Sequence, residues 1–325
     1  MKKNTISYAK YGYIFSIPFV VAFLIFQLYP IIYTALIGFT DLKGLGNTTM
    51  HFLKEPFKNF QLILSNPSFK IALKNTFVIW ITNFIPQMLV ALILSAWFTS
   101  STRIRGQGFF KVVFYMPNII TAATVAILFG ALFSYPKGPA NDFLILLGHN
   151  KIDFAQSKLS AQLVVAFIQF WMWYGYTMII LTSGILGINP EVFEAAEIDG
   201  TNGFQKFMLI TLPNLKTIML FTLVTSLIGG LQMFDIPKLY LLGGPDNATL
   251  TTSVFIYNQA FSGSYLYNRA AAASMIMFLI IAVLSSILFF LLRDKDEAAM
   301  AKAERKRIRA YNRQLKAQRA NGGTK

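Results

Sequence analysis

Long runs of apolar residues alternate with short polar segments along this chain. Six of the runs approach the roughly 20 residues that an α-helix needs to cross the hydrocarbon core of a bilayer. They cover 12–37, 76–98, 112–133, 159–186, 216–236 and 271–292. The first run is too long for the apolar part of a secretory signal peptide and lacks a clear small-residue cleavage site, so it should stay in the protein. The pattern predicts an all-α, polytopic membrane protein of about six transmembrane helices.

Composition supports the membrane assignment. Hydrophobic residues make up 55% of the 325 residues and charged residues only 13%, about half the charged share of soluble domains. A soluble chain with this pattern would have to bury several helices on every side, which one core of this size cannot do. Cysteine is absent and the two histidines lie far apart in the sequence, so we expect no disulfide and no metal site.

The net charge of +15 is unevenly distributed. The tail 293–325 carries eleven Lys and Arg residues against four acids, and the loop 99–111 carries three basic residues and no acid. Because basic residues collect on the cytoplasmic side of membrane proteins, we expect both termini, 1–11 and the tail, in the cytoplasm. The tail should form a solvated helix over 298–318, next to anionic lipid rather than nucleic acid.

The polar loop between the fourth and fifth spans has the features of a helix–turn–helix. Pro190 suits the first turn of a helix, and acids follow where the helix dipole favours them. Gly200 and Gly203 are expected to break this helix, and a second short helix is expected from Phe204 to a point before Pro213. The residues leave two alternatives open, an amphipathic helix on the lipid surface or a helix that docks into a cleft on a partner.

The order of residues in this loop resembles a known family. The pattern Glu194-Ala195-Ala196, Asp199-Gly200, Phe204, Phe207 and Ile210-x-Leu212-Pro213 is similar to the EAA loop of binding-protein-dependent ABC permeases. Three motifs elsewhere are also typical of that family: Arg105-Gly106-x-Gly108-Phe109-Phe110, Gly243-Gly244-Pro245-x-Asn247-Ala248-Thr249 and Tyr257-x-x-Ala260-Phe261. The resemblance covers most of the chain and is closest to the carbohydrate-uptake branch, which includes the larger maltose permease subunit. Thr201-Asn202 departs from the small residues common at the turn.

The resemblance implies a type I ABC importer permease fold, with the loop 188–213 as a coupling helix on a cytoplasmic ATPase dimer. The residues that would carry the coupling are Glu194, Ala195, Ala196, Asp199, Gly200, Phe204, Phe207 and Pro213. Gly200 would make the turn, and Asp199 would cap the following turn or pair with a basic residue of the ATPase.

The chain has no G-x-x-x-x-G-K-[ST] phosphate loop. ATP and Mg would therefore be used by a separate ATPase, and no cofactor is expected on this chain. The resemblance implies two further partners, a second homologous permease and an extracytoplasmic solute-binding protein. It places the assembly in the plasma membrane of a prokaryote.

Polar and aromatic residues within the spans are the candidates for a substrate path, because polar groups are costly in a bilayer. Gln169, Trp173 and Tyr176 share one helical face at i, i+4 and i+7. This pattern suits either a sugar or an aromatic belt at the membrane interface. The other candidates are Met172, Ser226, Gly230, Met233, Asn83 and Gln87. The glycine also suits close helix packing, and the two residues of the second span also suit bonds to a neighbouring helix.

These features predict the permease subunit of an ATP-driven importer for a sugar or oligosaccharide, without catalytic residues of its own. Glycerol-3-phosphate or a polyol derivative is the alternative cargo. A phosphorylated cargo would require cations in the cavity, and no Lys or Arg lies in the core of a span. A secondary transporter would need an ionisable residue at midplane, and a membrane enzyme would need a catalytic cluster. The sequence offers neither.

Overall fold

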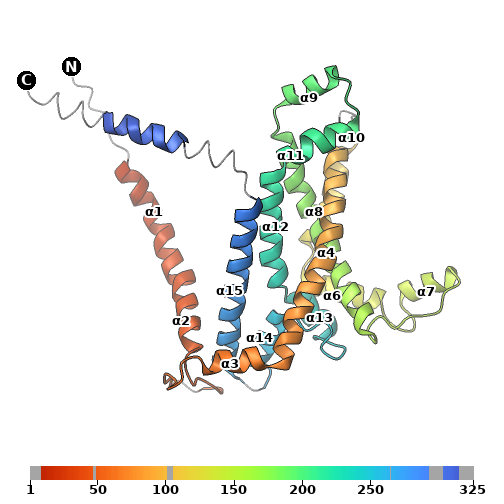
Figure 1. Cartoon of the computed structure of the whole chain (residues 1–325). Coiled ribbons are helices and arrows are strands. Elements are labelled where there is room, and N and C mark those ends of the chain that lie inside the picture. The colour runs from red at the N-terminus through yellow and green to blue at the C-terminus, as the bar shows by residue number, and fades with distance from the viewer. Residues whose placement is uncertain (1–8, 47–48, 101–104, 264, 293–302, 315–325) are drawn as a thin grey trace, which may run out of the picture. The chain divides into compact units, whose positions relative to one another are not determined.

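The computed structural model describes residues 9–46, 49–100, 105–263, 265–292 and 303–314. In these ranges the chain is helical and has no β-strand, apart from an isolated antiparallel bridge between Thr40 and Phe52. The all-α fold expected from the sequence is therefore confirmed (Figure 1). Within the described residues five helical segments are long and apolar enough to cross a membrane, or six when the broken pair α5 and α6 counts as one span.

The helices follow one another along the chain with two short π turns, η1 and η2, among them. They are α1 (Ala9–Phe23), η1 (Leu24–Leu28), α2 (Tyr29–Ile37), α3 (Lys58–Ser65), α4 (Pro67–Thr99), α5 (Gln107–Ile119), α6 (Ala122–Leu132), α7 (Pro139–Leu146), α8 (Lys158–Leu186), α9 (Pro190–Ile198), α10 (Gly203–Lys206), η2 (Phe207–Thr211), α11 (Leu212–Asn214), α12 (Lys216–Leu231), α13 (Asp235–Leu241), α14 (Thr252–Phe261) and α15 (Tyr267–Leu292). A further helix covers 303–314, inside the range expected for the tail helix. The rest of the tail and residues 1–8 lie outside the described residues.

Several spans differ from the ranges expected from hydropathy. The helix α4 begins at Pro67 rather than near residue 76, because its first turns are polar and hydropathy marks only the apolar part of a helix. The third span, expected as one helix over 112–133, is two helices interrupted at Ile120. The β-branched run Ile119-Ile120-Thr121 has low helix propensity, which favours a break there. The fifth span likewise breaks after Leu231 and resumes as α13.

Two prolines are accommodated by π turns instead of ending their helices. The N–H of Tyr29 donates to the carbonyl oxygen of Leu24 just before Pro30, and the N–H of Leu212 donates to Phe207 just before Pro213. The wider turn relieves the clash between the proline ring and the preceding turn. The expectation that a helix ends before Pro213 is therefore wrong, since α11 carries the helix on to Asn214.

The chain divides into two compact units, which are described separately. The first unit comprises Met1–Trp80, Ala122–Val165 and Leu231–Ile281. The second unit comprises Ile81–Thr121, Ala166–Gly230 and Ala282–Lys325.

The core of the first unit joins α3, α4, α14 and α15 with the segment before α14. Its buried side chains are Ile63, Phe69, Ala72, Leu250, Val254, Phe255, Ala272 and Ala273. The rings of Phe69 and Phe255 meet edge to face with their centroids 5.5 Å apart. Small residues on α15 allow its backbone to approach this core closely.

Buried amides hold the segment between α13 and α14 in the first unit. Asn75 Nδ2 donates to the carbonyl oxygens of Asn247, at 2.6 Å, and Leu250, at 3.2 Å. Gln162 Nε2 donates to the carbonyl oxygen of Ala248 at 2.8 Å and to Asn75 Oδ1 at 3.0 Å. The segment is not helical, so its carbonyl oxygens lack the hydrogen bonds that a helix would supply. The side-chain amides of Asn75 and Gln162 supply them instead. The family-typical motif that begins at Gly243 is thus fixed by α4 and α8.

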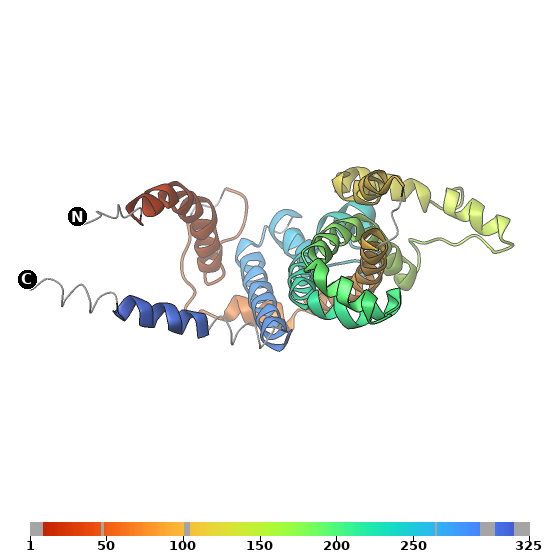
Figure 2. The same ribbon diagram turned by 90° about the horizontal axis from the view of Figure 1, so that it is seen from above.

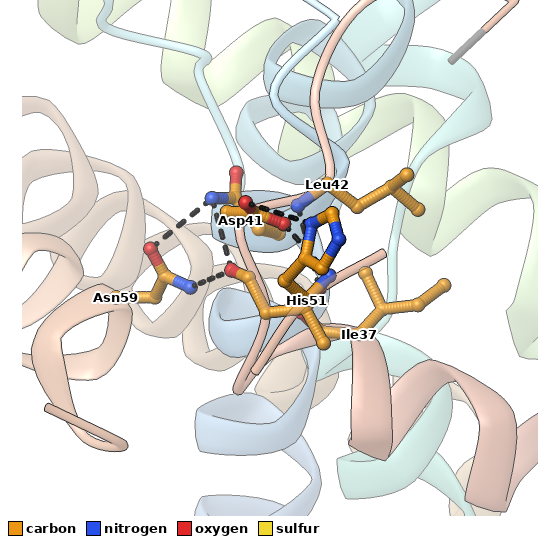
Figure 3. Close-up of polar contacts among 7 residues, drawn as sticks. Ile37, Asp41, Leu42, His51 and Asn59 are labelled. Atoms are coloured by element: carbon orange, nitrogen blue, oxygen red, sulfur yellow. Dashed lines mark hydrogen bonds and ion pairs between the residues drawn. The ribbon is translucent and has the colours of Figure 1, made fainter. Parts of the chain in front are cut away.

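A second group of amides ties the loop after α2 to α3 and α15 (Figure 3). The buried Asn59 donates from Nδ2 to the carbonyl oxygens of Gly38 and Thr40, both at 2.9 Å. The buried Asn268 donates to the same Thr40 oxygen and to Asn59 Oδ1, both at 3.3 Å. Three segments far apart in the sequence therefore share one hydrogen-bond network.

Asp41 and His51 close the same loop at its exposed side (Figure 3). The backbone N–H of His51 donates to Asp41 Oδ1 at 3.0 Å, and His51 Nδ1 lies 3.7 Å from Asp41 Oδ2. The backbone hydrogen bond from His51 holds the pKa of the Asp41 carboxyl below its usual range.

Candidate functional site

The loop 188–213 belongs to the second unit and begins with a well-capped helix. Asn189 is the N-cap of α9, and its side-chain oxygen accepts the backbone N–H of Glu191 at 3.1 Å. Pro190 occupies the first helical position, as its fixed φ favours. These residues define the start of α9 sharply, as the sequence predicts.

The turn after α9 is a Schellman motif built on Gly200. This glycine has a φ of +73°, which a residue with a side chain adopts only at a cost. The N–H of Thr201 donates to the carbonyl oxygen of Ala196 and the N–H of Gly200 to that of Glu197, both at 3.1 Å. The Thr201 hydroxyl also donates to the Ala196 oxygen, at 2.6 Å. Thr201, a departure from the family pattern, thus reinforces the turn.

The short helix α10 starts with a capping box that sequence reasoning missed. The Asn202 side chain accepts the N–H of Gln205, and the Gln205 side chain accepts the N–H of Asn202, both at 2.9 Å. Asn202 rather than Asp199 therefore caps the second helix. Gly203, expected to break the first helix, is instead the first residue of α10. The spacing N-x-x-Q is a readable signature of such a box.

One ion pair braces the two helices of the loop. Lys206 Nζ lies 2.6 Å from Glu197 Oε1, joining the end of α10 to the last turn of α9. Figures 1 and 2 show these two helices next to each other. The pair is partly exposed, so its contribution to stability is small, but it limits the angle that the two helices adopt.

The braced loop leaves large apolar side chains uncovered. Ile198 is 87% exposed and Phe204 is 73% exposed. Of the eight residues expected to carry coupling, those exposed are Glu194, Ala195, Asp199, Gly200, Phe204 and Pro213. Ala196 is buried under the turn and Phe207 is partly buried. Exposed apolar groups rimmed by charges mark interaction sites, and Ile198 is one that sequence reasoning missed.

The substrate-path candidates on α8 lie on two sides of this helix. Trp173 and Tyr176 are both exposed and meet edge to face, with centroids 5.8 Å apart and ring planes at 90°. Gln169 lies one turn before Trp173 and is partly exposed. Met172 is buried, and its carbonyl oxygen accepts the Asn118 side-chain amide at 3.3 Å. The structure thus leaves an aromatic pair open beside one amide.

The candidates on the other helices are mostly buried. Gln87 Nε2 donates to Thr177 Oγ1 of α8 at 2.8 Å, so its amide joins two helices. Asn83 is buried one turn away on α4. The two α12 candidates, Ser226 and Gly230, are partly exposed. Met233 is buried and belongs to the first unit, where its carbonyl oxygen accepts the Thr251 hydroxyl at 2.9 Å.

Gly175 sets the distance between α8 and α5, a role that sequence reasoning missed. A Cβ atom at this position would lie 2.0 Å from the carbonyl oxygen of Phe114 and 2.9 Å from the Tyr115 Cα. Only a residue without a side chain permits this backbone approach. Gly175 lies between Trp173 and Tyr176 in the sequence, so the close approach occurs on the part of α8 that carries the aromatic pair.

The described residues hold no group of three or more histidine, acidic or cysteine side chains suited to a metal ion. The candidate site has two parts, the exposed helix–turn–helix of the loop 188–213 and the face of α8 that exposes the rings of Trp173 and Tyr176.

Comparisons with known proteins agree with this geometry. Residues 62–300 match the family of binding-protein-dependent transport system inner membrane components. The lactose transport system permease protein LacF of Rhizobium radiobacter is 31% identical over 87% of this chain and 94% of its own length. The arabinooligosaccharides transport system permease protein AraP of Bacillus subtilis (strain 168) is 30% identical over 85% of this chain and 86% of its own.

The fold also matches solved structures. A chain of a bacterial ABC transporter involved in the import of the acidic polysaccharide alginate superposes with a TM-score of 0.73 at 23% identity, covering 87% of this chain and 95% of that one. At this low sequence identity, the superposition shows that the two chains share a fold, which is that of a chain of an ABC importer. The long apolar helices, the capped helix–turn–helix and the family match together show that this multi-pass chain belongs to the inner membrane components of binding-protein-dependent transport systems.

Proposed function

We propose that the chain is the permease subunit of an ATP-driven importer and forms, with a second permease, the translocation path for a sugar or oligosaccharide. An extracytoplasmic binding protein delivers this cargo. The named relatives support a carbohydrate, since they are permeases of lactose and arabinooligosaccharide transport systems. The trehalose/maltose permease MalF of Thermococcus litoralis, 27% identical over 84% of this chain, adds a third.

The exposed apolar surface of the loop 188–213 is the observation that carries the coupling role. Ile198 and Phe204 project from two short helices whose angle is set by the Schellman turn, the capping box and the Glu197–Lys206 pair. A rigid, apolar projection transmits a push from a partner better than a mobile one, because little of the motion is lost in the loop itself. The exposed Glu194 and Ala195 complete the docking face.

The proposal also includes the power source and the location of the chain. The ATPase is a separate chain that binds ATP and Mg and pairs as a dimer below the two permeases. The loop then lies in the cytoplasm, and with an even number of spans both termini lie there too. The assembly resides in the plasma membrane of a prokaryote, in contact with its lipid.

The open face of α8 supplies the sugar contacts in this proposal. The C–H faces of a pyranose ring pack on aromatic rings such as Trp173 and Tyr176, while Gln169 is placed to hydrogen-bond hydroxyl groups. The further contacts proposed along the path are Ser226 and Gly230 on α12. Met172, Asn83 and Gln87 are buried residues of the second unit, and we propose that they support the path rather than contact the cargo. Met233 belongs to the first unit and is a further residue proposed for the path.

A matched pair of glycine variants tests the coupling role. Gly200→Ala meets no neighbour within 4 Å but forces alanine into a left-handed backbone, whereas Gly203→Ala meets no neighbour either and has ordinary φ. The strain at position 200 is about 1–2 kcal/mol and falls on the turn alone.

In proteoliposomes of the whole complex, we expect Gly200→Ala to lower transport per ATP hydrolysed, with Gly203→Ala close to wild type. Glu194→Ala should uncouple in the same way while leaving membrane insertion intact. Equal transport per ATP in Gly200→Ala, Glu194→Ala and wild type would contradict the coupling role.

A further inference from the structure

The helix 303–314 in the basic tail combines basic and apolar residues for which the proposed transport function gives no role. It carries five basic residues and one acid, and every residue in it is exposed. The two large apolar side chains, Ile308 and Tyr311, are 52% and 62% exposed. Short helices gain most of their stability from packing of an apolar face, so covering these two side chains by an external surface would stabilise this helix.

The apolar and basic residues are arranged on separate faces. Ile308 and Tyr311 are three positions apart and share one face of the helix. At 100° per residue, Arg305 and Arg307 lie on the two sides of this face, at roughly 60° and 100° from Ile308. Lys306 points away from it. Glu304, the one acid of the helix, lies about 40° from Ile308, on the same face. The face is therefore a narrow apolar stripe that contains one carboxylate and has cations on both flanks, and the excess of cations favours an anionic membrane interface.

The chain itself brings this helix to the membrane surface. The last span is described as far as Leu292 and the tail helix from residue 303, so ten residues of the chain lie between the two described helices. Even a fully extended chain of ten residues reaches only about 36 Å. The helix therefore remains at a high local concentration beside the headgroups into which the span emerges.

We propose that the helix 303–314 binds the anionic phospholipid headgroups of the membrane surface, with Ile308 and Tyr311 inserted between them. The guanidinium and ammonium groups pair with phosphates, and their aliphatic stems extend along the apolar boundary. Binding fixes the cytoplasmic end of α15 to the membrane. This inference is independent of the cargo and of the loop 188–213.

Single cysteines test the proposal on the full chain, which has no native cysteine. The variants Ile308→Cys, on the apolar face, and Ala310→Cys, about 200° away around the helix, carry an environment-sensitive fluorophore. The protein is placed in nanodiscs of phosphatidylcholine with or without phosphatidylglycerol. We expect a blue shift at position 308, absent at position 310, only in the anionic discs. The shift should disappear at high salt, which screens charge.

A second variant separates charge from apolar contact. Replacing Arg305, Arg307 and Arg309 together with glutamine in the Ile308→Cys chain should abolish the blue shift, whereas replacing them with lysine should retain it. The proposal is overturned if position 308 shows no shift in anionic discs. It is equally overturned if the shift is independent of lipid charge, or if it requires the ATPase instead, which would make this helix a protein-binding surface.

Discussion

Replacing Gly175 with alanine should force α8 away from α5. The new Cβ would lie 2.0 Å from the carbonyl oxygen of Phe114, whereas carbon–oxygen contacts are favourable only from about 3.3 Å. The two backbones must therefore separate by about 1.3 Å at this point. The obstacle is backbone, so no side-chain rotation relieves it.

The cost follows from the contacts that the separation weakens. Overpacking of a well-packed site costs about 1–3 kcal/mol, and a backbone obstacle places Gly175→Ala at the upper end. The bond from Asn118 Nδ2 to the Met172 carbonyl oxygen, already 3.3 Å long, would be lost as well. Interhelical hydrogen bonds in membranes contribute about 0.6 kcal/mol on average. We therefore expect a destabilisation of about 3 kcal/mol.

The assay is the thermal midpoint of the detergent-solubilised chain, followed by the fraction that remains monodisperse after heating. Two further glycine variants serve as controls, one on α8 itself and one on α12. Gly184→Ala meets the Ile218 Cδ1 at 2.4 Å, a side-chain end that can rotate, and Gly229→Ala meets nothing within 4 Å. All three changes gain the same helix propensity, so their order reports packing alone.

We expect the thermal midpoint of Gly229→Ala to equal or slightly exceed that of wild type, that of Gly184→Ala to fall slightly, and that of Gly175→Ala to fall by roughly 5 °C or more. A wild-type midpoint in Gly175→Ala would refute the close approach of α8 and α5.

Three further predictions concern single polar contacts. Gln87→Leu and Thr177→Val, measured alone and together in a denaturant titration, should show a coupling energy of about 0.6 kcal/mol across the 2.8 Å bond, and additive effects would show that the bond is absent. Asn202→Ala should remove the capping box, cost about 1 kcal/mol and speed amide hydrogen exchange in α10 but not in α8; unchanged exchange in α10 would contradict the cap. Because the pKa of the Asp41 carboxyl is held below its usual range by the His51 N–H, this bond stabilises the loop above the ordinary carboxyl pKa and is lost as the pH falls through the lowered value. Protection of the His51 amide should therefore decline only in strong acid, and Asp41→Asn should remove that pH dependence; a decline near neutral pH would contradict the assignment.

The spans were predictable because they depend on a local property. A run of about 20 apolar residues spans a bilayer whatever lies beside it, so the helices and the all-α fold follow from hydropathy. The helix start at Pro67 was not predictable in this way, since polar first turns carry no hydropathy signal. The helix continues past Pro213 because a π turn precedes it, and no residue pattern in the sequence predicts that turn.

The parts of the candidate site that depend on neighbouring residues in the sequence were predictable, and the contacts between distant helices were not. The turn at Gly200 depends on neighbouring residues and was expected, and the Asn202–Gln205 box had a readable spacing that was overlooked. Gln87 fitted two roles in the sequence, and only the position of Thr177 shows that its amide joins two helices. The close approach at Gly175 could not be foreseen, because the sequence does not say which helix faces this glycine.

Cross-linking from the loop to the ATPase tests the central claim most directly. In the cysteine-free chain, Ala195→Cys places one exposed thiol on α9, and Leu146→Cys places one at an exposed position of α7. The whole complex is treated with a thiol-to-amine cross-linker in its native membrane. We predict an ATPase adduct from position 195 and none from position 146. The absence of an adduct from position 195, or equal adducts from both positions, would contradict the account.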